Sequence, residues 1–166
     1  MERKGWCRPS PSWPVGIGGK GNEGVTGQVK NTPNTIGYVE LAYALQNSLP
    51  AALVKNANGA FVDATIDSVT AAAAASAGNT PDDLRVSITN APGAAVYPIS
   101  SYTYILVYKN QKDAAKGKAL IDFLWWGIHD GQSFAKPLEY ATLPADIVKR
   151  AEAKLNSVTA GGAPLR

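Results

Sequence analysis

The sequence has very little of the side chains that most often bind transition metals or act as nucleophiles. Among its 166 residues there is one cysteine, Cys7, and one histidine, His129. A lone cysteine cannot close an internal disulfide, and one thiol with one imidazole falls short of the ligand set of a structural zinc site. The composition therefore excludes a disulfide-stapled scaffold and offers no metal site.

Charge is also scarce. Charged residues make up 17% of the chain and the net charge is +3, whereas about 25% of an average soluble domain is charged. The densest basic clusters are the pairs Arg3-Lys4 and Lys149-Arg150. A nucleic-acid surface needs a concentrated stripe of lysine and arginine, so we expect no nucleic-acid partner.

Long apolar runs are absent as well. No stretch of the sequence approaches the run of about 18 apolar residues that a membrane-spanning helix requires. Residues 1–13 lack the apolar middle region of a secretory signal peptide, so the chain as written carries no export signal. The 45% of hydrophobic residues suffices for the core of one domain at this length.

Hydrophobic periodicity and turn residues predict an α/β architecture, with strands separated by helices. Residues 1–12 are expected to be irregular, and so is the proline-containing segment 90–101. Helices are expected from Glu23 to before Thr32-Pro33 and at 41–45, 63–78, 114–126 and 144–156. Strands are expected at 36–39, 52–55, 84–88 and 102–108.

Two polar side chains are predicted to cap these helices. Asn22 would cap the helix that begins at Glu23, and Asp63 would cap the alanine-rich helix that ends at Gly78-Asn79, because a short polar side chain can accept hydrogen bonds from free N–H groups at a helix start. The strongest strand prediction is 102–108, because tyrosine, threonine, isoleucine and valine dominate it.

Glycine is concentrated between Gly16 and Gly27, around Lys20. Such density marks backbone that turns sharply or approaches another group closely. The segment 16–21 matches GxGxxG, and Glu40 lies about 20 residues further on, where a dinucleotide fold places an acidic residue. That fold also needs a buried strand before the first glycine, and Trp13-Pro14-Val15 is a poor one. A dinucleotide-dependent enzyme is therefore a disfavoured interpretation.

The same segment is not a Walker A loop. Pro14 stands where the first glycine is required, and Gly21 stands where a serine or threonine would bind magnesium. Lys20 lies close to a helix start, where its charge and the free backbone N–H groups could attract an anion. The alternative, which we favour, is a solvent-exposed lysine in a glycine-rich loop.

Side chains suited to catalysis are not arranged for it. His129 precedes Asp130, but adjacent residues rarely face each other, so we expect a surface histidine at a helix end. Trp125-Trp126 is expected to pack in the core and a groove. Candidate nucleophiles without a neighbouring base are Ser100, Ser101 and Ser133. We therefore predict no catalytic residue, no metal site and no cofactor, and so not an enzyme.

The order of several sequence blocks resembles one family. The blocks are GGKGNEGVTGQVK (18–30), TPNTIGYVELAYA (32–44), NGAFVDATIDSVTAAAA (58–74), NAPGAAVYPISSYTYILV (90–107), ALIDFLWWGIHDGQ (119–132) and LEYATLPADIVKRAE (138–152). In this order, across about residues 13–155, they are similar to the PstS-type phosphate-binding proteins of bacterial ABC importers.

That resemblance implies a partial type II periplasmic-binding-protein fold, in which two α/β lobes joined by crossover strands close on a phosphate ion. Residues 13–89 would form the latter part of the second lobe, 90–101 the crossover or hinge region, and 102–166 the part that returns to the first lobe. The implied partners are inorganic phosphate and the ABC permease of the importer, and the implied location is the periplasm or cell envelope.

The phosphate ligands of the family are not matched in this chain. By resemblance they lie N-terminal to the glycine-rich block and include an Arg-Ser-Asp-Gly-Ser-Gly-Thr segment, which residues 1–12 do not contain. No ligand-binding residue can therefore be assigned. We expect a truncated chain that binds phosphate poorly or not at all and exposes apolar strand edges. The alternative is a non-binding remnant with only a structural or interaction role.

Overall fold

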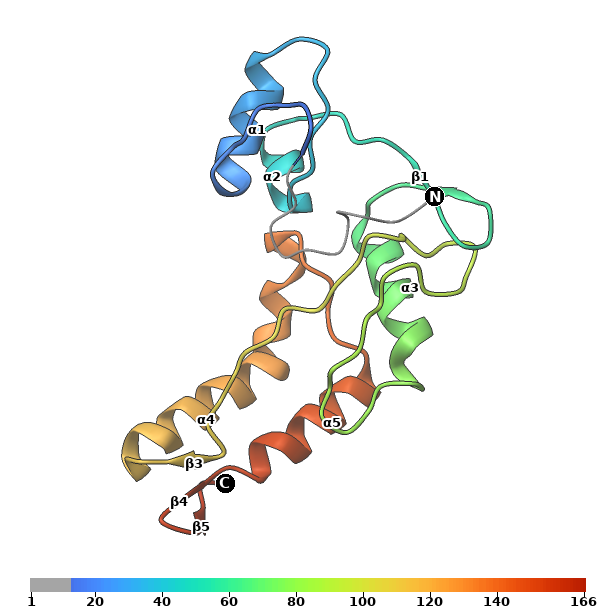
Figure 1. The fold of residues 1–166 in the computed structure, drawn as a ribbon. Coiled ribbons are helices and arrows are strands. Elements are labelled where there is room, and N and C mark those ends of the chain that lie inside the picture. The colour runs from blue at the N-terminus through green and yellow to red at the C-terminus, as the bar shows by residue number, and fades with distance from the viewer. Residues whose placement is uncertain (1–12) are drawn as a thin grey trace. The chain divides into compact units, whose positions relative to one another are not determined.

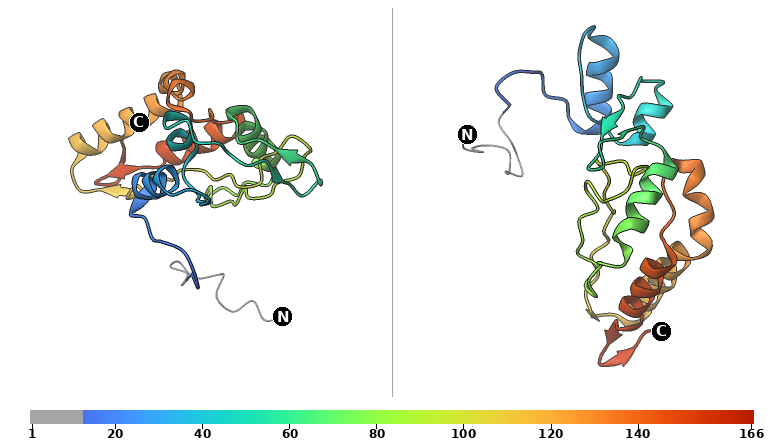
Figure 2. Two further views of the ribbon diagram at one scale, coloured as in Figure 1. Left: turned by 90° about the horizontal axis from the view of Figure 1, so that it is seen from above. Right: turned by 90° about the vertical axis from the view of Figure 1, so that its right-hand side faces the viewer.

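The computed structural model describes residues 13–166, so the irregular segment predicted at 1–12 lies outside the described part of the chain. The chain divides into two compact units, an N-terminal unit up to Pro50 and a C-terminal unit from Ala51 onward. Figures 1 and 2 colour the first unit blue to cyan and the second green to red. The lobe boundaries predicted at 89–90 and 101–102 are a different division and stay predictions.

Between residues 13 and 50, the N-terminal unit contains two helices, α1 (Gly21–Asn31) and α2 (Leu41–Gln46). Both confirm predicted helices, and α1 ends before Thr32-Pro33 as the proline requires. The segment at 36–39 does not form the predicted strand. Ile36 in this segment is 93% exposed. A strand needs a neighbouring strand to complete its hydrogen bonds, and the two helices of this unit provide none.

The predicted cap of α1 was wrong. The helix begins two residues before Glu23, and Lys20 holds the N-cap position. Asn22 Oδ1 instead accepts a hydrogen bond from the backbone N–H of Glu40 at 3.0 Å. The Tyr43 hydroxyl donates to Glu23 Oε1 at 2.8 Å. Both bonds tie α1 to the region around α2.

Several glycines of the N-terminal unit allow close backbone packing. A Cβ atom at Gly19 would lie 2.6 Å from the carbonyl carbon of Gly24 and from the nitrogen of Val25. A Cβ atom at Gly37 would lie 2.7 Å from Cγ2 of Val29. The loops on either side of α1 can therefore contact the helix only because these positions lack side chains.

The C-terminal unit contains two small sheets. Strands β1 (Val54–Lys55) and β2 (Phe61–Val62) form an antiparallel hairpin in which Val54 faces Val62. The second sheet has the order β3-β4-β5. Its strands are β3 (Asn110–Gln111), β4 (Thr159–Ala160) and β5 (Ala163–Pro164), with β3 parallel and β5 antiparallel to β4.

Three helices accompany these sheets. They are α3 (Ile66–Ala77), α4 (Ala114–Ile128) and α5 (Ala145–Asn156), and the 3-10 turns η1 (Asp130–Phe134) and η2 (Lys136–Leu138) follow α4. All three confirm predicted helices. Helices and small sheets together confirm a partial α/β fold, with strands much shorter than the sequence predicts.

The predicted cap of α3 was also wrong. The N–H of Ser68 donates to Thr65 Oγ1 at 3.1 Å, and the N–H of Thr65 donates to Ser68 Oγ at 3.0 Å. This reciprocal capping box satisfies two donors at the helix start. Asp63 contributes only its backbone carbonyl, which accepts from the Ser68 hydroxyl at 2.7 Å. The C-terminal end at Gly78 is as predicted.

The C-terminal unit has two separate apolar clusters. The first joins α3 to the irregular segment 90–101, which adopts no regular structure as predicted; its buried members are Ala72, Ala91 and Val96. The second lies between α4, α5 and the chain end, and its buried members are Ile121, Leu155 and Val158. Because each cluster is small, hydrogen bonds contribute a large share of the organisation around α3.

The buried side chain of Asn56 is the densest hydrogen-bonding point of this unit. Its Nδ2 group donates to the carbonyls of Gly93, Ala94 and Val96 at 3.0–3.1 Å. Its Oδ1 atom accepts from the N–H groups of Asn58 and Ala60 at 3.0 and 3.1 Å. One carboxamide therefore fixes the β1–β2 turn and anchors the 93–96 loop against it.

Two predicted strands of the C-terminal unit are not formed. Residues 84–88 and 102–108 have no regular secondary structure. The hydroxyl of Tyr104 donates to the carbonyl of Val86 at 2.9 Å and lies 3.4 Å from its N–H. The two segments run side by side in Figures 1 and 2. They are joined by the Tyr104 side chain and not by hydrogen bonds between their backbones.

Adding a side chain at Gly19 should destabilise the N-terminal unit. Gly19→Ala forces its methyl group into the backbone of α1, and such overpacking costs about 1–3 kcal/mol. The matched control is Gly27→Ala within α1, where a Cβ atom meets nothing within 4 Å. This control should gain about 0.5–1 kcal/mol from helix propensity. Urea unfolding followed by circular dichroism measures both, and equal effects would refute the packing role.

Replacing Asn56 with aspartate should strongly destabilise the C-terminal unit. Asn56→Asp keeps an acceptor for the turn but points a carboxylate at three carbonyls, and buried unsatisfied groups cost about 1–3 kcal/mol each. Asn58→Ala is the control, because it removes one exposed hydrogen bond to the Gly93 N–H and should cost about 1 kcal/mol or less. A urea midpoint that is equal for the two variants would contradict the role of Asn56.

Candidate functional site

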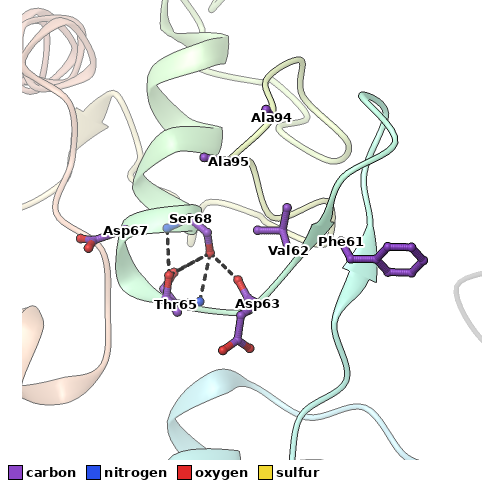
Figure 3. A pocket seen from close by; sticks show the side chains of 8 residues that line it. All are labelled: Phe61, Val62, Asp63, Thr65, Asp67, Ser68, Ala94 and Ala95. Atoms are coloured by element: carbon purple, nitrogen blue, oxygen red, sulfur yellow. Dashed lines mark hydrogen bonds between the residues drawn. The ribbon is translucent and has the colours of Figure 1, made fainter.

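A pocket of about 390 Å³ lies at the start of α3. Its lining comes from β2, the capping residues of α3 and the 94–95 loop, as Figure 3 shows. The lining residues are Phe61, Val62, Asp63, Thr65, Asp67, Ser68, Ala94 and Ala95. Since the pocket adjoins a helix N-terminus, where anions often bind, we compared its chemistry with that of a phosphate ion.

The polar groups of this pocket do not suit an anion. The N–H groups of Thr65 and Ser68 already donate within the capping box. The remaining polar side chains, Asp63 and Asp67, are carboxylates, and in Figure 3 they point to different sides of the helix start. The lining contains no lysine or arginine. Because two carboxylates would repel an anion and the lining offers no cationic side chain, the chemistry of this pocket does not suit phosphate.

At the start of α1, a carboxylate of the chain itself lies in the first turn. Glu23 lies in the first turn, and hydrogen bonds from its own backbone N–H and from the Tyr43 hydroxyl hold the pKa of this carboxyl below its usual range. The carboxylate therefore occupies the place that an external anion would take. Lys20 is exposed beside it, as the favoured interpretation of the sequence predicted.

The dinucleotide interpretation was wrong. Residues 13–19 contain no strand, so the first glycines do not follow the buried strand that a dinucleotide fold requires. Within the glycine-rich block, Gly19 instead allows the close backbone packing against Gly24 and Val25 described above. At this position the block is a packing feature of the N-terminal unit.

His129 caps the end of α4 and connects it to α5. Its Nδ1 atom lies 2.8 Å from the Trp125 carbonyl, and its Nε2 atom lies 2.7 Å from Glu152 Oε1. The Trp125 carbonyl, and after it Glu152, raise the pKa of His129 above its usual value. The imidazole ring stacks on the Trp125 ring at 4.7 Å. The helix-end position of His129 was predicted, and its partner is Glu152, which the sequence analysis did not identify.

The other catalytic candidates have ordinary structural roles. The three serines donate to nearby carbonyls, Ser100 to Tyr97, Ser101 to Tyr102 and Ser133 to Asp130. Trp125 packs against the cluster around Ile121, and Trp126, which is 43% exposed, stacks on Phe123. Within residues 13–166, no three side chains of histidine, cysteine, aspartate or glutamate are placed to hold a metal ion.

Comparison with known domains decides the family. Residues 9–125 match the family described as the PBP superfamily domain. The chain belongs to the PBP superfamily. The matched range includes the glycine-rich block, the pocket, Asn56 with its hydrogen-bond partners and most of α4, so both units contain PBP superfamily sequence.

Three similar proteins carry the same name. The Phosphate-binding protein PstS of Xylella fastidiosa (strain 9a5c) is 45% identical over 144 residues, which cover 87% of this chain and 40% of the relative. The protein of the same name from Pasteurella multocida is 37% identical over 145 residues, covering 87% and 42%. That from Methanocaldococcus jannaschii is 38% identical over 158 residues, covering 83% and 40%.

The chain therefore spans about two fifths of the length of the curated relatives that it matches, between 40 and 42%. A PBP superfamily fold in this chain is accordingly partial. None of the helices within residues 13–166 has the length and apolar character needed to cross a membrane.

The contact between His129 and Glu152 should make stability depend on pH. Since the folded pKa of His129 is raised, the stabilisation is fully present below the unfolded pKa of about 6.5. It is lost as the pH rises through the folded pKa. Glu152→Gln should therefore lower the urea midpoint more at about pH 5.5 than at about pH 9.

Glu139→Gln is the control for this experiment. It removes a carboxylate that forms no ion pair among the described residues, so its effect should not change across this pH range. A Glu152→Gln effect that is equally large at both pH values would contradict the assignment of the proton to His129.

Proposed function

We propose that this chain is part of the phosphate-binding component of an ABC-type phosphate import system. The observation that carries the proposal is the 45% identity to a protein named as phosphate-binding over 87% of the chain. The chain would be a binding component and not an enzyme. Its serines and its histidine are engaged in local structural contacts, which supports that view.

Within this function the chain would supply scaffold and not the ion ligands. The pocket at α3 is acidic, and the first turn of α1 is occupied by Glu23. A dehydrated phosphate needs several N–H, hydroxyl or guanidinium donors that converge on it. We propose that such donors lie in the part of the relatives' length that this chain does not span.

The proposed partners are inorganic phosphate and the ABC permease of the importer, in the periplasm or cell envelope. The second candidate is a non-binding remnant with a structural or interaction role. The acidic pocket and the extended apolar segment at 102–108 favour this candidate for the chain in isolation. The two candidates differ in what happens when the rest of the domain is supplied.

Calorimetric titration of the chain alone with phosphate tests whether the ion ligands lie outside it. The chain alone should give no saturable heat up to about 1 mM phosphate, because an affinity of that order needs about 4 kcal/mol of net binding free energy. Saturable binding at micromolar concentrations or tighter would overturn the view that the ligands lie elsewhere.

A fusion protein tests the function itself. It joins this chain to the part of the Xylella fastidiosa relative that the chain does not match. Under the proposal the fusion protein binds phosphate at micromolar concentrations, and sulfate does not compete, because a carboxylate acceptor rejects an ion without a proton. A folded fusion protein that does not bind phosphate would favour the remnant.

A further inference from the structure

The segment 102–108 is an exposed apolar stretch of the C-terminal unit. Its sequence, YTYILVY, contains only β-branched and aromatic residues together with one leucine, a composition typical of a strand. Yet Leu106 is 96% exposed, Tyr108 87% and Ile105 67%. Since Ile105 and Leu106 are adjacent, they point to opposite faces of an extended chain. The segment is therefore apolar on both faces.

The backbone of this segment has no strand partner among the described residues, and only its end carbonyls, at Tyr102 and Tyr108, accept hydrogen bonds from neighbouring side chains. Among the described residues, no backbone hydrogen bond of residues 103–107 is made to another segment. The contact with Val86 comes from the Tyr104 side chain. In Figure 1 the segment is a yellow tube that leads directly into β3.

The segment leads into the β3-β4-β5 sheet. In the order β3-β4-β5, β3 is an edge strand and pairs in parallel with β4. Residues 102–108 precede β3 in the chain, and Val107 already packs against the cluster around Ile121. Strands of parallel sheets in α/β proteins are apolar on both faces because layers cover both sides. The segment has the composition of such an internal strand.

We propose that residues 102–108 form an internal strand of the PBP superfamily fold, and that its neighbouring strand comes from the part of the domain outside this chain. The chain spans 40% of the length of its Xylella fastidiosa relative, so that domain includes further chain able to supply a strand and a covering layer. A second copy of this chain would supply only another edge and would leave apolar faces uncovered. This inference rests on the fold and not on the proposed function.

Co-expression tests the proposal. The chain is produced together with an affinity-tagged fragment, namely the part of the Xylella fastidiosa relative that the chain does not match. The chain should co-purify with the fragment in phosphate-free buffer, so that association is measured separately from ion binding.

Leu106→Lys is the decisive variant. Its side chain is almost fully exposed here, so circular dichroism of the chain alone should not change. Burial of a leucine contributes enough that its loss should weaken the complex by about tenfold or more. The matched control is Phe61→Lys, which is 67% exposed but lies on β2, whose backbone is already paired. Its effect should stay within about threefold.

Three results would overturn the proposal. One is failure of the chain to co-purify with the fragment. Another is a complex that Leu106→Lys leaves unchanged. The third is a dimer of this chain alone that depends on Leu106, measured by light scattering, because it would assign the segment to a second copy.

Discussion

An extended backbone can bury its side chains only when a neighbouring strand completes its hydrogen bonds, and this constraint governs most of the structure. Helices satisfy their N–H and C=O groups within one segment, and α1 to α5 all form. Strands depend on distant segments, and the strands within residues 13–166 are two residues long. Helices are therefore well formed in the described part of the chain, whereas its sheets are small.

The same distinction explains what the sequence could and could not predict. Helix positions followed from local periodicity and from breakers such as Thr32-Pro33. Both predicted caps were wrong. Asn22 accepts a hydrogen bond from a backbone N–H 18 residues away, and Thr65, not Asp63, caps α3. His129 and Glu152 are 23 residues apart in the sequence, and no sequence pattern predicts their contact. The strand at 102–108 was predicted from composition alone, which carries no information about partners.

Two features changed their meaning once the structure was known. The glycine-rich block, which resembles a phosphate cradle in sequence, packs against α1 at Gly19, and the loop after α1 does so at Gly37. Asn56, which follows the predicted strand at 52–55, organises both the β1–β2 turn and the 93–96 loop. A sequence pattern that is typical of a ligand site can therefore have a purely structural role.

The proposed assignment of residues 102–108 to an internal strand requires a neighbouring strand from outside this chain. Amide hydrogen exchange, measured at Tyr104 to Val107 in the free chain and in the fusion protein, tests this most directly. We expect rapid exchange in the free chain and protection approaching that of global unfolding in the fusion protein. Equally rapid exchange in both proteins, with the fusion protein folded, would contradict it.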